Sequence, residues 1–154
     1  EVQAFAMPKT IAPPLMTRYA PGMNYGAHSD SAFMMVDGQV LRSDLSSTIF
    51  LGDPASYEGG ELSVRLGERW IDFKLPAGGA VVYPSTTIHE VRPVTSGERL
   101  VAITFMESPV PDQMQREILF QLNEVAATEA FNVSWESRTR LSYISGLLTR
   151  MWAK

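Results

Sequence analysis

The chain has 154 residues, of which 45% are hydrophobic and 19% charged, so we expect one domain's worth of sequence with a buried core. Its 13 basic and 17 acidic residues give a net charge of −4, which argues against a nucleic-acid partner because a phosphate backbone attracts basic surfaces. Cysteine is absent, which excludes disulfide scaffolds, zinc fingers, iron–sulfur clusters and thiol nucleophiles.

The subcellular location is predicted from the features that the sequence lacks. No apolar run approaches the roughly 20 residues of a membrane span and no signal peptide opens the chain, so we expect a cytoplasmic protein without a membrane partner. The lack of cysteine is compatible with that location. Because the first residue is Glu1 rather than Met, we also expect that part of the N-terminal region is missing.

Proline and glycine interrupt residues 1–110 repeatedly, and short runs with strand character lie between them. The predicted strands cover residues 15–20, 45–51, 61–66, 69–75, 79–83, 87–91 and 100–106. Gly67 and Glu68 separate two of these runs, which is typical of a tight hairpin. Seven or eight short strands at this spacing predict a mainly β core over residues 1–110, built as an antiparallel sandwich or jelly roll.

Residues 31–44 contain Phe33, Met34 and Met35 without a clear period. Apolar residues in a mobile loop often become buried only when a partner binds, so this segment can form a lid over a substrate. Packing on the sheet is an equally good interpretation.

The composition changes after Pro111, where prolines vanish and helical periodicity begins. Asp112 can cap a first helix, and a second helix is predicted over residues 137–152. We therefore expect residues 111–154 to form a C-terminal helical extension. It would pack on the core or, through these helices, on a second copy in a homo-oligomer.

Only two histidines occur, and they suggest a metal site. His28 and Asp30 are two residues apart, so in an extended segment both side chains project from the same face. His89 follows a predicted strand, and a jelly roll can bring it beside that pair. Two imidazoles and one carboxylate with open positions form the arrangement typical of non-haem Fe(II) oxygenases. A His-x-Asp pair alone is weak evidence, because either histidine can instead be structural.

Arg99 strengthens the metal hypothesis. It begins the apolar run of residues 100–106, ten residues after His89. An arginine that enters a β core is costly unless it meets an anion, and its planar fork suits a small carboxylate. The alternative is a surface arginine that closes a hairpin next to Glu98.

A set of motifs, taken in this order, resembles a known family. They are Arg18-Tyr19-Ala20-Pro21-Gly22, His28-Ser29-Asp30, Tyr57-Glu58-Gly59-Gly60-Glu61-Leu62, Leu75-Pro76-Ala77-Gly78-Gly79, Tyr83-Pro84-Ser85, His89-Glu90-Val91 and Arg99. Together they resemble the Fe(II)/2-oxoglutarate-dependent dioxygenases of the prolyl-4-hydroxylase-like superfamily, and within it the bacterial PKHD-type hydroxylases.

The resemblance implies a double-stranded β-helix (jelly roll) with the metal at its open end. His28, Asp30 and His89 would be the ligands of Fe(II), and Arg99 would pair with the C5 carboxylate of 2-oxoglutarate. Tyr19 matches a family tyrosine that hydrogen-bonds this cosubstrate. Phe50 lies near the position where some animal prolyl hydroxylases have a tyrosine. Unlike that tyrosine, Phe50 cannot donate a hydrogen bond.

The implied reaction uses O2 to hydroxylate a C–H bond of a peptidyl residue or a small metabolite while 2-oxoglutarate becomes succinate and CO2. Ascorbate would be a supporting cofactor. Two alternatives stay open: a cupin-type metalloprotein with another divalent ion, and a non-catalytic jelly-roll binding module. A zinc hydrolase ranks behind them, because zinc hydrolysis offers no role for Arg99.

Overall fold

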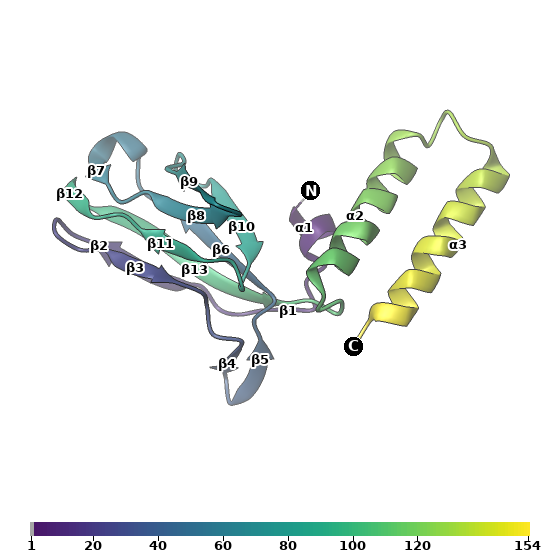
Figure 1. The fold of residues 1–154 in the computed structure, drawn as a ribbon, viewed down its shortest axis with the longest axis horizontal. Coiled ribbons are helices and arrows are strands. Elements are labelled where there is room, and N and C mark those ends of the chain that lie inside the picture. The colour runs from purple at the N-terminus through teal and green to yellow at the C-terminus, as the bar shows by residue number, and fades with distance from the viewer. Residues whose placement is uncertain (1) are drawn as a thin grey trace. The chain divides into compact units, whose positions relative to one another are not determined.

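The computed structural model describes residues 2–154, which form two compact units (Figure 1). Thr10–Glu107 make up a β unit. The residues up to Lys9 and Ser108–Lys154 make up a helical unit. Strands are present at all seven predicted positions and helices follow them, so the prediction of a mainly β jelly roll with C-terminal helices is confirmed.

Two antiparallel sheets build the β unit. The first sheet has the order β1 (Thr10–Ile11), β13 (Arg99–Glu107), β6 (Leu45–Phe50) and β10 (Ala80–Pro84), with β2 (Leu15–Tyr19) also paired to β13. The second sheet has the order β3 (Tyr25–His28), β11 (His89–Val91), β8 (Leu62–Leu66) and β9 (Arg69–Phe73). Two small pairs complete the unit: β7 (Tyr57–Gly59) with β12 (Val94–Gly97), and β4 (Phe33–Val36) with β5 (Gln39–Arg42). A short 3₁₀ turn, η1 (Pro54–Ser56), precedes β7.

The core of the β unit combines side chains from both sheets. Leu62 and Val64 of β8 are buried with Tyr83 of β10 and Val101 of β13 in one cluster. The alternation of β8 produces this packing, because every second side chain of a strand faces the same side. Gly67 connects β8 to β9 with a positive φ of 63°, so the predicted hairpin is present.

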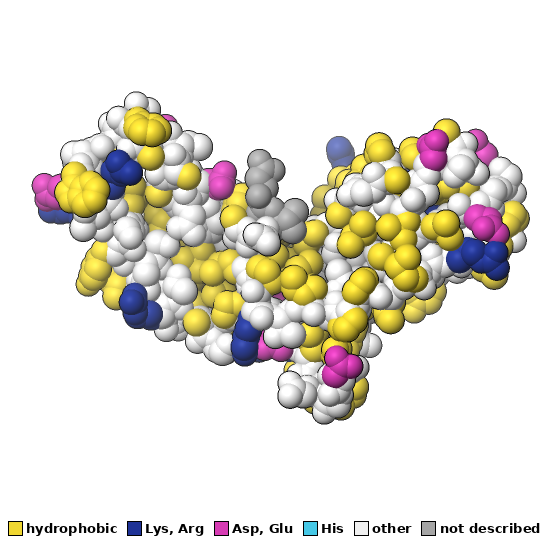
Figure 2. All heavy atoms as spheres, turned by 180° about the vertical axis from the view of Figure 1, so that it is seen from behind, with side chains coloured by type: hydrophobic (Ala, Val, Ile, Leu, Met, Phe, Trp, Pro, Cys, Tyr) yellow, Lys and Arg dark blue, Asp and Glu magenta, His cyan; other side chains and the backbone are white. Residues whose placement is uncertain are grey.

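Residues 31–44 contain a hairpin of β4 and β5. Asp37 and Gly38 both have positive φ, as a tight two-residue hairpin turn requires. Leu41 is buried against Phe105 and Ala12, whereas the face that carries Phe33, Met35 and Val40 is exposed. The hairpin, which projects at the bottom of Figure 2, therefore packs on the sheet through one face only.

The helical unit contains α1 (Val2–Ala6), α2 (Gln113–Thr128) and α3 (Trp135–Trp152). The Asp112 carboxylate accepts the N–H of Gln115 at 2.9 Å, so the predicted helix cap is present. Ser134 caps α3 through the N–H of Ser137, and α3 begins two residues earlier than predicted for this reason. In the described part of the chain, no helix has the length and apolar character needed to cross a membrane.

Candidate metal centre and active site

The strand pairing of the second sheet brings His28, Asp30 and His89 together. His28 ends β3, His89 begins β11, and the two residues are direct partners in the antiparallel pair. Asp30 follows β3 and places its carboxylate 3.8 Å from Nε2 of each imidazole. One possible ligand atom of each residue lies within 4.8 Å of the other two, which is close enough to hold one ion.

Backbone carbonyls orient both imidazole rings. Nδ1 of His28 lies 2.8 Å from the carbonyl oxygen of Gly26, and Nδ1 of His89 lies 3.0 Å from that of Thr87. A carbonyl only accepts, so each Nδ1 carries the proton and each Nε2 keeps its lone pair for a metal. A hydrogen bond of this kind fixes the ring orientation of most metal-binding histidines.

These three residues line a cavity of about 180 Å³, whose remaining lining comes from strands of both sheets. Its polar lining includes the three residues of the cluster together with Arg99, and its apolar lining is contributed by Leu15, Leu62, Val91, Ile103 and Phe105. Pockets for drug-sized ligands have volumes of roughly 300–1,000 Å³, so this cavity suits a smaller molecule.

Arg99 is the most unusual side chain of the cavity. It is only 1% exposed, yet Nε, Nη1 and Nη2 have no hydrogen-bond partner among the described residues. Burial lowers its pKa from the usual value, with nearby tyrosines and Glu61 opposing the shift. Its guanidinium lies 5.0 Å from the ring centre of Tyr19 and 5.6 Å from that of Phe50. A buried cation with three unused donor atoms is suited to bind an anion.

Tyrosine hydroxyls and Thr48 supply further polar groups. Tyr19 is the strand partner of Arg99 and is nearly buried; burial raises its pKa, with Arg99 opposing, so it remains a donor. Burial also raises the pKa of Tyr83, while a hydrogen bond with Thr48 opposes this shift. The ring of Phe50 lies against the Arg99 guanidinium, so Phe50 contributes a cation–π contact and no hydrogen bond.

Two features of the site were missed in the sequence. A side chain on Gly60, which has a φ of 67°, would place Cβ 2.9 Å from Cγ2 of Val94 and 3.0 Å from Cδ of Arg99, so this glycine leaves the space for both side chains. Ser46 of β6 donates a hydrogen bond to Oδ2 of Asp30. The glycine lies in a quoted motif, whereas nothing in the sequence marked Ser46.

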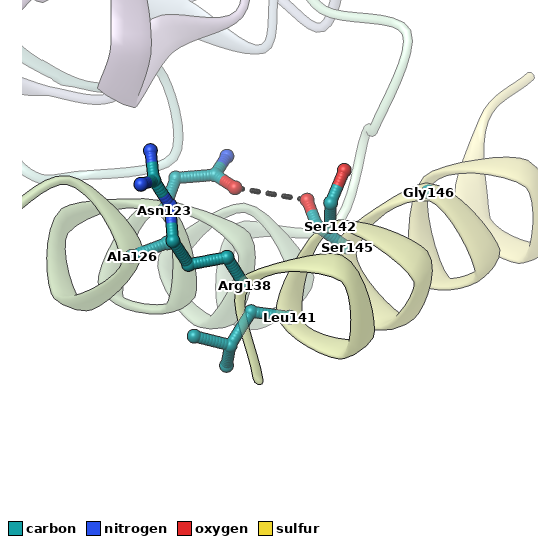
Figure 3. A pocket seen from close by; sticks show the side chains of 7 residues that line it. All are labelled: Asn123, Ala126, Arg138, Leu141, Ser142, Ser145 and Gly146. Atoms are coloured by element: carbon teal, nitrogen blue, oxygen red, sulfur yellow. Dashed lines mark hydrogen bonds between the residues drawn. The ribbon is translucent and has the colours of Figure 1, made fainter. Parts of the chain in front are cut away.

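The helical unit has a groove of its own between α2 and α3 (Figure 3). Ser145 of α3 donates a hydrogen bond of 2.8 Å to the side-chain oxygen of Asn123 of α2 across it. Arg138 is the only charged residue in its lining, and the lining contains no histidine or carboxylate. The lining of this groove therefore does not provide a metal-binding cluster like the one in the β unit.

A jelly roll that holds a His–Asp–His cluster and a buried arginine in one cavity defines the class: a protein with a candidate non-haem metal site. Residues 14–107 match the 2OG-Fe(II) oxygenase superfamily, and the chain belongs to this family. The comparisons confirm the resemblance seen in the sequence and make the chain an enzyme of the oxygenase class.

Curated relatives extend the match beyond the β unit. The PKHD-type hydroxylase of Sphingopyxis alaskensis is 54% identical over 151 residues, which cover 97% of this chain and 69% of that protein. The PKHD-type hydroxylase tll1907 of Thermosynechococcus vestitus is 50% identical over 125 residues, which cover 80% of this chain and 55% of that protein. The crystal structure of a Pseudomonas putida prolyl-4-hydroxylase is 26% identical, with a TM-score of 0.53 over 68% of this chain and 56% of that one.

Proposed function

We propose that this chain is an Fe(II)- and 2-oxoglutarate-dependent hydroxylase of a peptidyl residue or a small metabolite. The observation that carries the proposal is the guanidinium of Arg99. It has no hydrogen-bond partner among residues 2–154 and lines the same cavity as the His–Asp–His cluster. A cupin-type metalloprotein or a binding module has no use for a buried cation at this place. The family and the names of the relatives support the same activity.

The donor set fits Fe(II). His28 and His89 would bind the ion through Nε2 and Asp30 through a carboxylate oxygen, which leaves further positions open for small ligands. Bound iron would supply, together with 2-oxoglutarate and O2, the oxidation of a C–H bond with release of succinate and CO2. The chain's own contribution is to bind, orient and exclude water.

Arg99 would bind the carboxylate of 2-oxoglutarate that lies far from the metal. The guanidinium presents parallel N–H donors, and a carboxylate accepts two of them at once. Tyr19, which stays protonated, can donate to the same carboxylate. The rings of Tyr19 and Phe50 hold the guanidinium in place while the anion is absent.

The apolar part of the lining would keep water out. Leu62, Val91 and Ile103 are apolar and belong to the cavity lining, so a bound dicarboxylate would be shielded along its hydrocarbon part. Exclusion of water also strengthens the charge interaction of Arg99.

An anaerobic titration tests the proposal. Fe(II) is added first and 2-oxoglutarate second, and a weak visible absorption band should appear only when both are present. The band should fade when O2 is admitted, with succinate formed. Metal binding without band or succinate would contradict the role of 2-oxoglutarate. An Arg99→Ala variant that gives the band at the same 2-oxoglutarate concentration as the wild type would contradict the role of Arg99. Candidate peptides and metabolites are then screened for faster succinate formation.

A further inference from the structure

Three buried serines, one just before β6, one within β6 and one directly after β10, form a chain of hydrogen bonds that ends on Asp30. Ser46 is fully buried, Ser85 is 2% exposed and Ser43 is 7% exposed. The hydroxyl of Ser85 lies 2.8 Å from that of Ser46 and 2.7 Å from that of Ser43. The hydroxyl of Ser46 donates to Oδ2 of Asp30.

The direction of every bond in this chain follows from the carboxylate. A carboxylate oxygen only accepts, so the single proton of the Ser46 hydroxyl points to Asp30. Ser46 must then accept from Ser85, and Ser85 must accept from Ser43. All three hydroxyls are therefore oriented toward Asp30, and hydrogen bonds aligned in this way strengthen one another.

Ser85 also holds the backbone of Asp30. The N–H of Asp30 donates to the carbonyl oxygen of Ser85 at 3.1 Å. The side chain and the main chain of Asp30 are thus both held through Ser85. Oδ1 lies 3.8 Å from Nε2 of His28, and Oδ2, which accepts from Ser46, lies 3.8 Å from Nε2 of His89.

We propose that Ser46, supported by Ser85 and Ser43, is the positioning residue that holds the Asp30 carboxylate in the orientation in which it meets the metal. The inference rests on the proposed function and deepens it. The hydrogen bond from Ser46 uses one lone pair of Oδ2 and keeps the carboxylate at the distance from both imidazoles that one ion requires. The orientation exists before any ion arrives, so metal binding does not have to order the carboxylate.

The far end of the chain lies at the base of the β4–β5 hairpin. Ser43 follows β5 directly, and its N–H donates to the carbonyl oxygen of Ala32 at 2.9 Å on the other side of the hairpin base. The chain of oriented hydroxyls therefore begins with Ser43 at the base of the β4–β5 hairpin and ends on the carboxylate of Asp30.

A Ser46→Ala variant tests this role, with Ser47→Ala as the matched control. Ser47 is the next residue of β6, is 4% exposed, and points to the opposite face of the strand. Anaerobic titration with Co(II) measures affinity, and the visible spectrum of bound Co(II) reports its coordination. We expect Ser46→Ala to weaken Co(II) binding about 10- to 100-fold and to change the spectrum, while Ser47→Ala matches the wild type. Circular dichroism of the metal-free chains checks that both variants fold.

The outcomes separate the two proposals. Equal affinity and an unchanged spectrum in Ser46→Ala overturn the positioning role. A wild-type chain that binds no Co(II) overturns the proposed function itself. If Ser46→Ala does not fold, Ser85→Ala removes the donor behind Ser46 and takes its place, with weaker binding expected and unchanged binding decisive against the role.

Discussion

Replacement of Arg99 by methionine separates ligand binding from stability. The variant keeps an unbranched side chain in the buried position and removes the guanidinium. In the ligand-free protein this guanidinium has no hydrogen-bond partner among the described residues, so its removal breaks no hydrogen bond. The usual result for a paired buried charge, a loss of about 3–5 kcal/mol, is therefore not expected here.

Two opposing contributions set the change in stability. An unsatisfied buried polar group costs about 1–3 kcal/mol, and methionine relieves this cost. The contacts of the guanidinium with the rings of Tyr19 and Phe50 contribute about 0.5–2 kcal/mol each and are lost. The contributions nearly cancel, so the free energy of unfolding of the ligand-free variant should lie within about 1 kcal/mol of the wild type.

The affinity for 2-oxoglutarate should change far more. Hydrogen bonds to a charged group contribute about 1.5–3 kcal/mol, so loss of the guanidinium should raise the Kd roughly 10- to 150-fold. Isothermal titration without O2 measures the Kd, and denaturant unfolding measures stability. Arg18→Met is the matched control, since Arg18 lies on β2 in an exposed ion pair with Glu98.

Two results would refute this reasoning. A loss of 3 kcal/mol or more in the ligand-free variant, about the size expected for a broken buried ion pair, would mean that Arg99 is paired without its ligand. An unchanged Kd in a folded variant would mean that the anion binds elsewhere.

Three further predictions concern the metal, the space around Arg99 and the helical unit. His89→Ala should abolish Co(II) binding in a folded chain, as followed by titration, and retained binding would remove His89 from the ligand set. Gly60→Ala should lower the free energy of unfolding by about 1–2 kcal/mol, because φ is 67°, and should weaken 2-oxoglutarate binding more than Co(II) binding. Equal weakening of both would contradict the contact with Arg99. Asp112→Ala should destabilise the chain by about 0.5–2 kcal/mol through loss of the α2 cap, with metal affinity unchanged; an unaltered thermal midpoint would speak against the cap.

The strands were predictable because their pattern is local. Alternation in β8 and the glycine turn before β9 are both visible in the sequence. The β4–β5 hairpin was missed although Asp37-Gly38 is a strong turn signal, because Phe33–Val36 are apolar without interruption and hide the period of two. Strands as short as β1 carry no pattern at all.

The candidate site was predictable where the residue type itself is informative. A histidine two residues before an aspartate and an arginine at the start of an apolar strand are both unusual, so each suggested a ligand. The neighbourhood of His28 and His89 depends on strand register, which the sequence alone does not specify. Serine is common, and Ser43 and Ser46 form a hydrogen-bonded chain with Ser85 only once two distant segments meet.

Buried polar groups in this cavity fall into two kinds, and the difference predicts how the ligands bind. The serines and Asp30 satisfy one another before any ligand is present, so the metal ligands are ordered in advance. The Arg99 guanidinium has no hydrogen-bond partner in the described part of the chain, so an anion that reaches it gains an interaction that these residues do not supply. Metal affinity should therefore be sensitive to Ser46 and indifferent to Arg99. Co(II) binding by Arg99→Met at the wild-type affinity, measured beside its weakened binding of 2-oxoglutarate, would show that the two halves of the site are built independently; a parallel loss of both would show that they are coupled.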